Sequence, residues 1–263
     1  MIETKEKTES PTEQKRPRWL PWVIGLGLFA ALAIGGLIWF FAGDAPAEVD
    51  LTETVSAVDE SGGVETTAVE STAVETADGI EGEWSVDTTV GDFAVTDDTT
   101  ATFAGFRVEE VLESIGSTTA VGRTPEVSGN IEIEGTTLTS GEFVVDLTSI
   151  VSDQARRENA IQRALGTGAN PDATFVLTEP VELGDAAASG EMVEVVATGE
   201  LTLNGVTNTV EIPLQAQLVD GAILVTGSTD ILFADYSVTA PSAPVVVSVE
   251  DNGVLELQIW LTR

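Results

Sequence analysis

The sequence predicts a mainly β protein, in which one antiparallel sheet of about eight strands closes into a barrel and a helix covers an opening. From about Gly82 onward, short runs carry an apolar residue at every second position. Such alternation is typical of strands that bury one face. Turn sequences such as Asn204-Gly205 and Asp220-Gly221 separate these runs, as in β-hairpins.

In each expected strand, apolar residues recur at every second position. The pattern predicts strands over residues 143–147, 175–177, 193–203, 210–218, 223–233, 245–249 and 254–261, with further turns at Glu134-Gly135 and Asp251-Asn252-Gly253. Residues 153–165 break the pattern, because they are helix formers followed by Gly166, a typical helix C-cap. A second short helix is expected over residues 109–114.

An uncharged apolar run over residues 19–43 predicts a single transmembrane anchor. Its core, residues 22–41, would span roughly 30 Å as a helix, the thickness of bilayer hydrocarbon. Five basic residues precede the run, which favours a cytoplasmic tail over residues 1–18 and an exterior location for the rest. A cleaved signal peptide is the alternative, because residues 45–47 (Ala-Pro-Ala) resemble a cleavage site. The apolar run is, however, longer than the usual apolar h-region of a signal peptide.

Residues 44–81 form an acidic, low-complexity segment rich in Thr, Val and Glu, with a near-repeat that begins at Val64, Val69 and Val74. High charge and few large apolar side chains predict disorder, and like charges extend a chain. We therefore expect a disordered stalk between the anchor and a folded domain over residues 82–263.

Composition excludes several classes of function. Six arginines face forty acidic residues after the apolar run, and a surface of this sign repels nucleic acid. The chain has no cysteine and no histidine, which removes disulfides, thiol nucleophiles, histidine–zinc sites and Ser-His-Asp triads. No EF-hand loop is present, and no metal or cofactor is predicted.

The run Gly199-Glu-Leu-Thr-Leu-Asn-Gly-Val-Thr-Asn-Thr-Val210, followed by Ile212-Pro213, resembles the strand–turn–strand signature of YceI-like proteins. Trp84-Ser-Val-Asp87 is similar to the family's opening strand, and Pro171-x-x-x-Phe175 to the stretch after its helix. The resemblance covers residues 82–263. Phe106-Arg-Val-Glu-Glu110 also resembles the membrane-anchored actinobacterial branch.

This resemblance implies a lipocalin-like barrel whose lumen binds a polyisoprenoid or a fatty-acid derivative. It implies non-catalytic binding, storage or transport of such a lipid at the outer face of the cell membrane. One motif departs from the family. Where many relatives carry R-x-D-[FY]-G, this chain has Phe233-Ala-Asp-Tyr-Ser237, so a headgroup contact made by that arginine would be missing.

The predicted lumen contacts are apolar or aromatic residues on the expected strands, and ordinary core packing is the competing interpretation of each. They are Phe103, Phe143, Val145, Leu147, Phe175, Leu177, Leu201, Leu203, Ile212, Leu214, Ile231, Phe233 and Tyr236. Three arginines of the expected helix, Arg156, Arg157 and Arg163, could meet a headgroup at the mouth. The simpler interpretation pairs them with acids such as Asp153 and Glu158.

Two other functions stay open. The domain could be a structural or interaction module of the cell envelope with a filled barrel and no ligand. An enzyme acting on isoprenoids is the weakest alternative, because only carboxylates could serve as its general base. The sequence is compatible with a monomer and with a homodimer.

Overall fold

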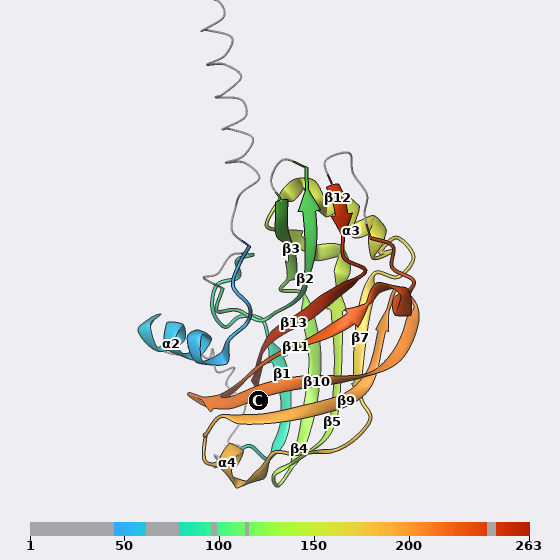
Figure 1. Ribbon diagram of the computed structural model, residues 1–263. Helices are drawn as coiled ribbons and strands as arrows, with labels where there is room; N and C mark the ends of the chain where they lie inside the picture. Colours follow the sequence, from blue (N-terminus) through green and yellow to red (C-terminus); the bar gives the residue numbers. More distant parts are fainter. Residues whose placement is uncertain (1–44, 62–78, 96–98, 114–115, 241–245) are drawn as a thin grey trace, which may run out of the picture. The chain divides into compact units, whose positions relative to one another are not determined.

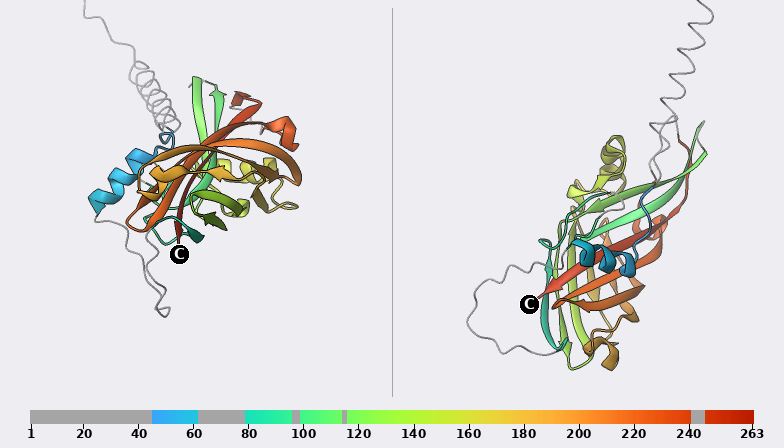
Figure 2. Two further views of the ribbon diagram at one scale, coloured as in Figure 1. Left: turned by 90° about the horizontal axis from the view of Figure 1, so that it is seen from below. Right: turned by 90° about the vertical axis from the view of Figure 1, so that its left-hand side faces the viewer.

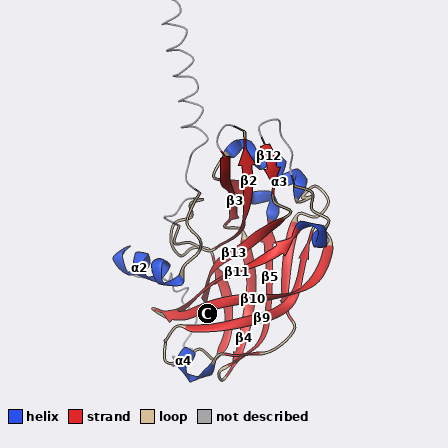
Figure 3. Ribbon diagram, viewed as in Figure 1, coloured by secondary structure: helices blue, strands red, loops and turns tan. Residues whose placement is uncertain are grey.

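The computed structural model describes residues 45–61, 79–95, 99–113, 116–240 and 246–263. The described part is mainly β (Figure 3), with thirteen strands in one sheet. Its α-helices are α2 (Leu51–Ser61), α3 (Glu158–Ala164) and α4 (Gly184–Ala188). None of the helices in these segments is long and apolar enough to cross a bilayer. The predicted tail (1–18) and anchor (19–43) lie outside the described residues and stay predictions.

Eight antiparallel strands form a closed barrel, which confirms the predicted architecture. In spatial order they are β1 (Gly82–Asp87), β4 (Val127–Glu134), β5 (Thr137–Asp146), β7 (Asp172–Leu177), β9 (Val193–Leu203), β10 (Val206–Val219), β11 (Ala222–Leu232) and β13 (Asn252–Thr262). Pairing of β1 with β13 closes the ring, with Ser85 opposite Thr262.

A small extension of the sheet branches from β13. The N-terminal half of β13 pairs with β2 (Phe103–Leu112), which continues to β3 (Gly116–Thr124) and β6 (Val151–Ser152). Strand β12 (Val246–Val249) pairs with β2 beyond the end of β13, and β8 (Val181–Glu182) pairs with β5. In Figure 1, β2, β3, β12 and α3 lie together at one end of the barrel.

Two local predictions in this extension are wrong. The helix expected over residues 109–114 is instead the end of β2, because Glu109 and Glu110 pair across to Thr119 and Thr118 of β3. The turn expected at Asp251-Asn252-Gly253 does not make a hairpin. It is a break between β12 and β13, which both pair with β2.

The other turns and the main helix follow the sequence signals. Asn204 and Asp220 have φ of 50°, and the glycine after each has φ of 74° and 86°. Positive φ at both central positions is what a two-residue hairpin turn of type I′ requires. The expected helix over 153–165 is present as η2 (Ala155–Arg157) and α3, which ends just before Gly166.

Each end of the barrel is covered by a separate apolar cluster. At one end, Leu183 and Ala187 of the α4 region pack with Ile80 and Trp84. At the other end, Ile161 of α3 packs with a set of buried residues that includes Leu147, Ile150, Leu203 and Tyr236. Figure 1 shows α3 and α4 at opposite ends of the strands. The barrel interior therefore lies between two covered ends.

Residues 45–61, here called the strap, lie on the outer wall of the barrel (Figure 2), so the predicted disordered stalk is wrong for this part of residues 44–81. Asp50 caps α2, since its Oδ1 accepts a hydrogen bond from the Glu53 N–H at 3.0 Å. Leu51 and Val58 are buried against Leu224 and Trp260. Residues 62–78 lie outside the described segments.

A buried ion pair holds the strap and the outer wall together. Arg123 Nε donates to Glu256 Oε1 at 2.7 Å, and the two residues are 2% and 3% exposed. Arg107 Nη1 lies 3.6 Å from Glu256 Oε2. The strap completes the cluster, because the carbonyl of Ala47 accepts from Arg107 at 3.0 Å and from Arg123 at 3.2 Å. The Thr54 hydroxyl also donates to Gln258 Oε1 at 2.7 Å.

Replacing Leu51 by Ala should lower the free energy of unfolding by about 2 to 4 kcal/mol, since it leaves a cavity between the strap and the wall. Urea unfolding measures this change. Thr52→Ala, at an exposed position of the same helix, should change the stability by less than about 0.5 kcal/mol. Equal, small effects of both variants would mean that the strap does not dock.

Arg123→Met should destabilise the protein by about 3 kcal/mol, because it leaves the buried Glu256 carboxylate without its closest cation. The double variant Arg123→Met/Glu256→Leu should regain most of that loss, since neither buried charge remains. A double-mutant cycle by chemical denaturation checks this. Simple additivity of the two single changes would contradict coupling through the pair.

Candidate functional site

Strand register sorts the side chains into an inner and an outer set. Along β9 and β10, Val210 lies opposite Gly199 and Ile212 lies opposite Ala197, whereas the alternate pair Thr209 and Glu200 points outward. The same alternation of inward-facing and outward-facing positions continues in the neighbouring strands. Phe175 of β7 lies opposite both Phe143 and Leu201. The interior is therefore lined by apolar residues from every strand.

The structure places most predicted lumen residues on this inner face or at its covered end. Phe143, Val145, Phe175, Leu177, Leu201, Leu203, Ile212, Leu214 and Ile231 face inward from β5, β7, β9, β10 and β11. Leu147 and Tyr236 lie in the apolar cluster at the α3 end. Phe233 begins η3 (Phe233–Tyr236), and its ring lies beside Gly253 of β13.

Phe103 is the exception, and its assignment to the lumen is wrong. It pairs with Gln258, which points away from the interior, and the Arg123 guanidinium lies 4.5 Å from its ring centroid. Apolar residues occur at both 103 and 106, so alternation alone does not decide which one faces inward. The structure selects Phe106, which pairs with the inward-facing Leu255.

Sequence reasoning also missed several inward-facing residues of the long strands. Val206, Val210 and Leu255 pack against the cluster at the α3 end, and Leu257 packs against the cluster at the α4 end. Each continues the alternation that identified its neighbours. The same signal could therefore have found them.

Many inward-facing side chains are only half-buried. This set includes Phe143, Phe175, Leu177, Val210, Leu214, Leu255 and Leu257. Other inward-facing side chains, among them Trp84, Leu201, Ile212 and Ile231, are buried. A fully packed core buries its side chains and leaves few voids. Accessible apolar surface between covered ends is what a space for an apolar molecule requires.

The arginines predicted at the mouth do not offer a cluster of available cations. Arg157 forms ion pairs with Glu110 and with Asp153, the latter at 2.9 Å. This confirms the simpler interpretation for Asp153, while Glu110, on β2, was not expected. Arg163 is exposed in the last turn of α3, and the side chain of Arg156 is not described.

Two asparagine side chains at the α3 end donate hydrogen bonds to backbone carbonyls. The Asn204 amide donates to the carbonyls of Tyr236 and Ser237 at 3.2 Å, and the Asn208 amide donates to the Asp235 carbonyl at 2.8 Å. The Tyr236 hydroxyl is buried without a hydrogen bond of normal geometry to the described residues, and the Asn208 side chain interacts with it. Burial raises the pKa of this phenol, so it stays protonated at neutral pH.

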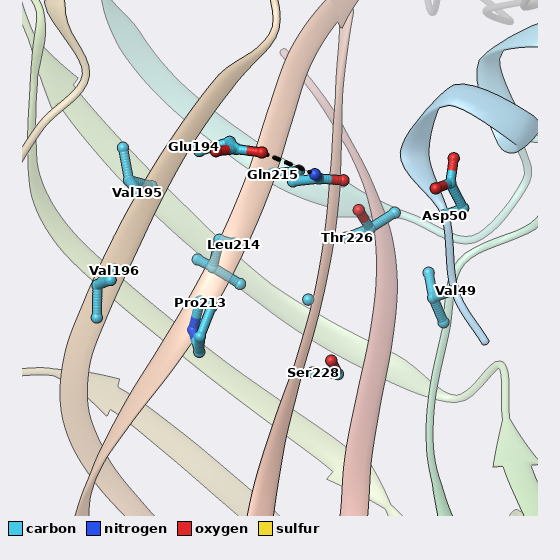
Figure 4. A pocket seen from close by; sticks show the side chains of 11 residues that line it. Val49, Asp50, Glu194, Val195, Val196, Pro213, Leu214, Gln215, Thr226 and Ser228 are labelled. Atoms are coloured by element: carbon cyan, nitrogen blue, oxygen red, sulfur yellow. Dashed lines mark hydrogen bonds between the residues drawn. The ribbon is translucent and has the colours of Figure 1, made fainter.

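A hollow lies on the outer wall, between the strap and strands β9, β10 and β11 (Figure 4). Its volume is about 630 Å³. Glu194 and Gln215, which share a 3.1 Å hydrogen bond, line it together with Asp50, Thr226 and Ser228. Carboxylates and other polar groups make this groove a poor site for hydrocarbon or for an anion. The barrel interior is the better candidate.

Comparison with solved structures gives similar folds at low sequence identity. A polyisoprenoid-binding domain from Saccharophagus degradans is 19% identical with a TM-score of 0.50, over 68% of this chain and 97% of that one. BcnA of Burkholderia cenocepacia is 14% identical with a TM-score of 0.47, over 60% and 95%. The YCEI protein of Campylobacter jejuni is 17% identical with a TM-score of 0.43, over 53% and 82%. The comparison with curated proteins gave no match.

A comparison with protein families matches residues 65–261 to the YceI-like domain. The match spans most of the chain and includes every strand of the closed barrel. Together with the barrel, its covered ends and its apolar interior, this shows that the chain belongs to the YceI-like family.

Proposed function

We propose that this protein binds a long-chain apolar lipid, of the polyisoprenoid or fatty-acid class, in its barrel lumen and stores or transfers it without chemical change. The observation that carries the proposal is the set of inward-facing apolar side chains that remain half-buried between two covered ends. Similarity in fold to a polyisoprenoid-binding domain supports the same class of ligand.

Burial of the chain would supply most of the affinity. Transfer of apolar groups from water is favourable by about 0.8 kcal/mol for each CH₂. A lumen lined by residues such as Phe143, Phe175 and Leu257 can therefore hold a long chain without a strong polar contact. The carboxylates of β9 and β10 do not oppose this, because Glu194, Glu200 and Glu211 occupy outward-facing positions.

The proposal includes a location. We infer from the uncharged run over residues 19–43 and the basic residues before it that the barrel is tethered at the outer face of the cell membrane. Protease treatment of intact cells, followed by detection of the two chain ends, tests this topology. Protection of the barrel in intact cells would contradict it.

Mass spectrometry of the full chain, before and after organic extraction, tests lipid binding directly. We expect a loss of mass equal to one long apolar molecule, and a return of mass when a prenyl or acyl lipid is added. An unchanged mass together with no uptake would mean a filled barrel. Such a result would favour a structural module of the cell envelope.

Val210→Trp should reduce uptake of an added acyl or prenyl lipid at least tenfold, because Val210 faces the interior opposite Gly199, where the Phe175 ring already lies. Thr209→Trp is the matched control, since this neighbour on the same strand is exposed and points outward. Native mass spectrometry measures the bound fraction of each folded variant. Equal uptake by both variants would place the ligand outside the lumen.

A further inference from the structure

The groove on the outer wall is formed in part by the strap. Val49 and Asp50 of the strap line one side of it, and β9, β10 and β11 line the rest (Figure 4). The strap precedes residues 65–261, the part of the chain that matches the YceI-like domain, so one side of this groove comes from a segment outside that domain. A volume of about 630 Å³ is sufficient for a small organic molecule.

Hydrogen-bond acceptors from neighbouring strands come together in this groove. The strand register places Gln215 of β10 directly opposite both Glu194 of β9 and Thr226 of β11. Figure 4 shows these side chains in a row that leads toward Asp50. The Gln215 amide donates to Glu194 Oε1 at 3.1 Å, which leaves the amide oxygen as an acceptor. No lysine or arginine is among the described residues that line the groove.

Thr226 gives an independent indication of a ligand. The residue is only 2% exposed and lines the groove, yet its hydroxyl makes no hydrogen bond to the described residues. Two other buried polar residues of the same wall are paired: the Thr102 hydroxyl donates to the Asp87 carbonyl at 2.6 Å, and the Gln258 amide donates to the Ala101 carbonyl at 2.9 Å. An unpaired polar group at a buried position is unfavourable, so the Thr226 hydroxyl needs a partner that enters from the groove.

We propose that the groove binds a primary ammonium group on a short aliphatic chain, as in a free diamine or the side chain of a lysine. An ammonium has three N–H donors, which suits a site made of acceptors. The carboxylates of Asp50 and Glu194 supply the opposite charge, and the Thr226 hydroxyl accepts one hydrogen bond. Val196 and Pro213, which also line the groove, cover the CH₂ groups of the ligand. This site is separate from the lumen and does not depend on lipid binding.

An alkylammonium fits the groove better than an anion or a metal ion does. Two carboxylates without a cation repel an anion. The described residues contain no group of three acidic side chains that could hold a metal ion. The apolar side chains beside the acceptors, including Val49 and Val196, would be of no use to a bare metal ion. They favour a ligand that carries hydrocarbon next to its charge.

Three five-carbon probes test the proposal: 1-aminopentane, 1,5-diaminopentane and 1-pentanol. The full chain in a non-ionic detergent is titrated with each probe at one ionic strength, and ligand-observed NMR gives the Kd. We expect both amines to bind roughly tenfold more tightly than the alcohol, because charge-assisted hydrogen bonds are the stronger ones. Nα-acetyl-lysine N-methylamide then identifies the source of the ammonium. Tighter binding than that of the diamine indicates a lysine side chain, and weaker binding indicates a free diamine.

Glu194→Gln and Asp50→Asn should each weaken binding of the amines roughly 3- to 10-fold, since each removes one charge. Asparagine also caps helices, so Asp50→Asn keeps the start of α2. Glu200→Gln is the matched control, because Glu200 is exposed on the same face of β9 but does not line the groove. It should leave the Kd unchanged. Thr226→Val should weaken binding about threefold without lowering the thermal stability, because it removes an unpaired hydroxyl.

Amine binding that depends only on the overall acidity of the protein gives a different result. Equal weakening by Glu200→Gln and Glu194→Gln would place the amine on the general negative surface and would overturn the site. Equal binding of the amines and the alcohol, or full affinity in Asp50→Asn and Glu194→Gln, would overturn it as well.

Discussion

The backbone pairing of β13 is the constraint on which the rest of the structure depends. One edge of this strand pairs with β11 along its length, while the other edge is shared between β2 and β1. The pairing with β1 closes the barrel, and the pairing with β2 starts the extension. Alternate residues of a strand point to opposite sides. In β13, the apolar Leu255 and Leu257 therefore face the interior, whereas the polar Glu256 and Gln258 face the outer wall.

Because Glu256 faces the outer wall, it can form a buried ion pair with Arg123 beneath the strap. Arg107 and Arg123 carry one charge more than Glu256 can neutralise, and backbone carbonyls of the strap accept further hydrogen bonds from both arginines. A buried charge needs such partners on every side. The strap is therefore part of the folded domain, and its docking depends on the two arginines that β2 and β3 bring together.

The sequence predicts what depends on local pattern, and it fails where a contact is distant along the chain. Alternation and turn residues identified the barrel strands and the hairpin at Asn204-Gly205. The strap was missed because its composition resembles that of a disordered segment, and its buried residues contact Leu224 and Trp260 far along the chain. Phe103 was misplaced because a strand shifted by one residue exposes the opposite face. Only pairing with β13 fixes the choice between Phe103 and Phe106.

The barrel interior and the groove on the outer wall differ in the kind of molecule that they could bind. The barrel interior is lined by apolar side chains, and Arg157 at its α3 end is engaged by two carboxylates. The outer groove mixes apolar residues with two carboxylates and an amide, so it is a less favourable site for the same lipid. The lipid proposed above would therefore be selected by the length and shape of its hydrocarbon more than by its headgroup, because burial of CH₂ groups would supply most of the affinity.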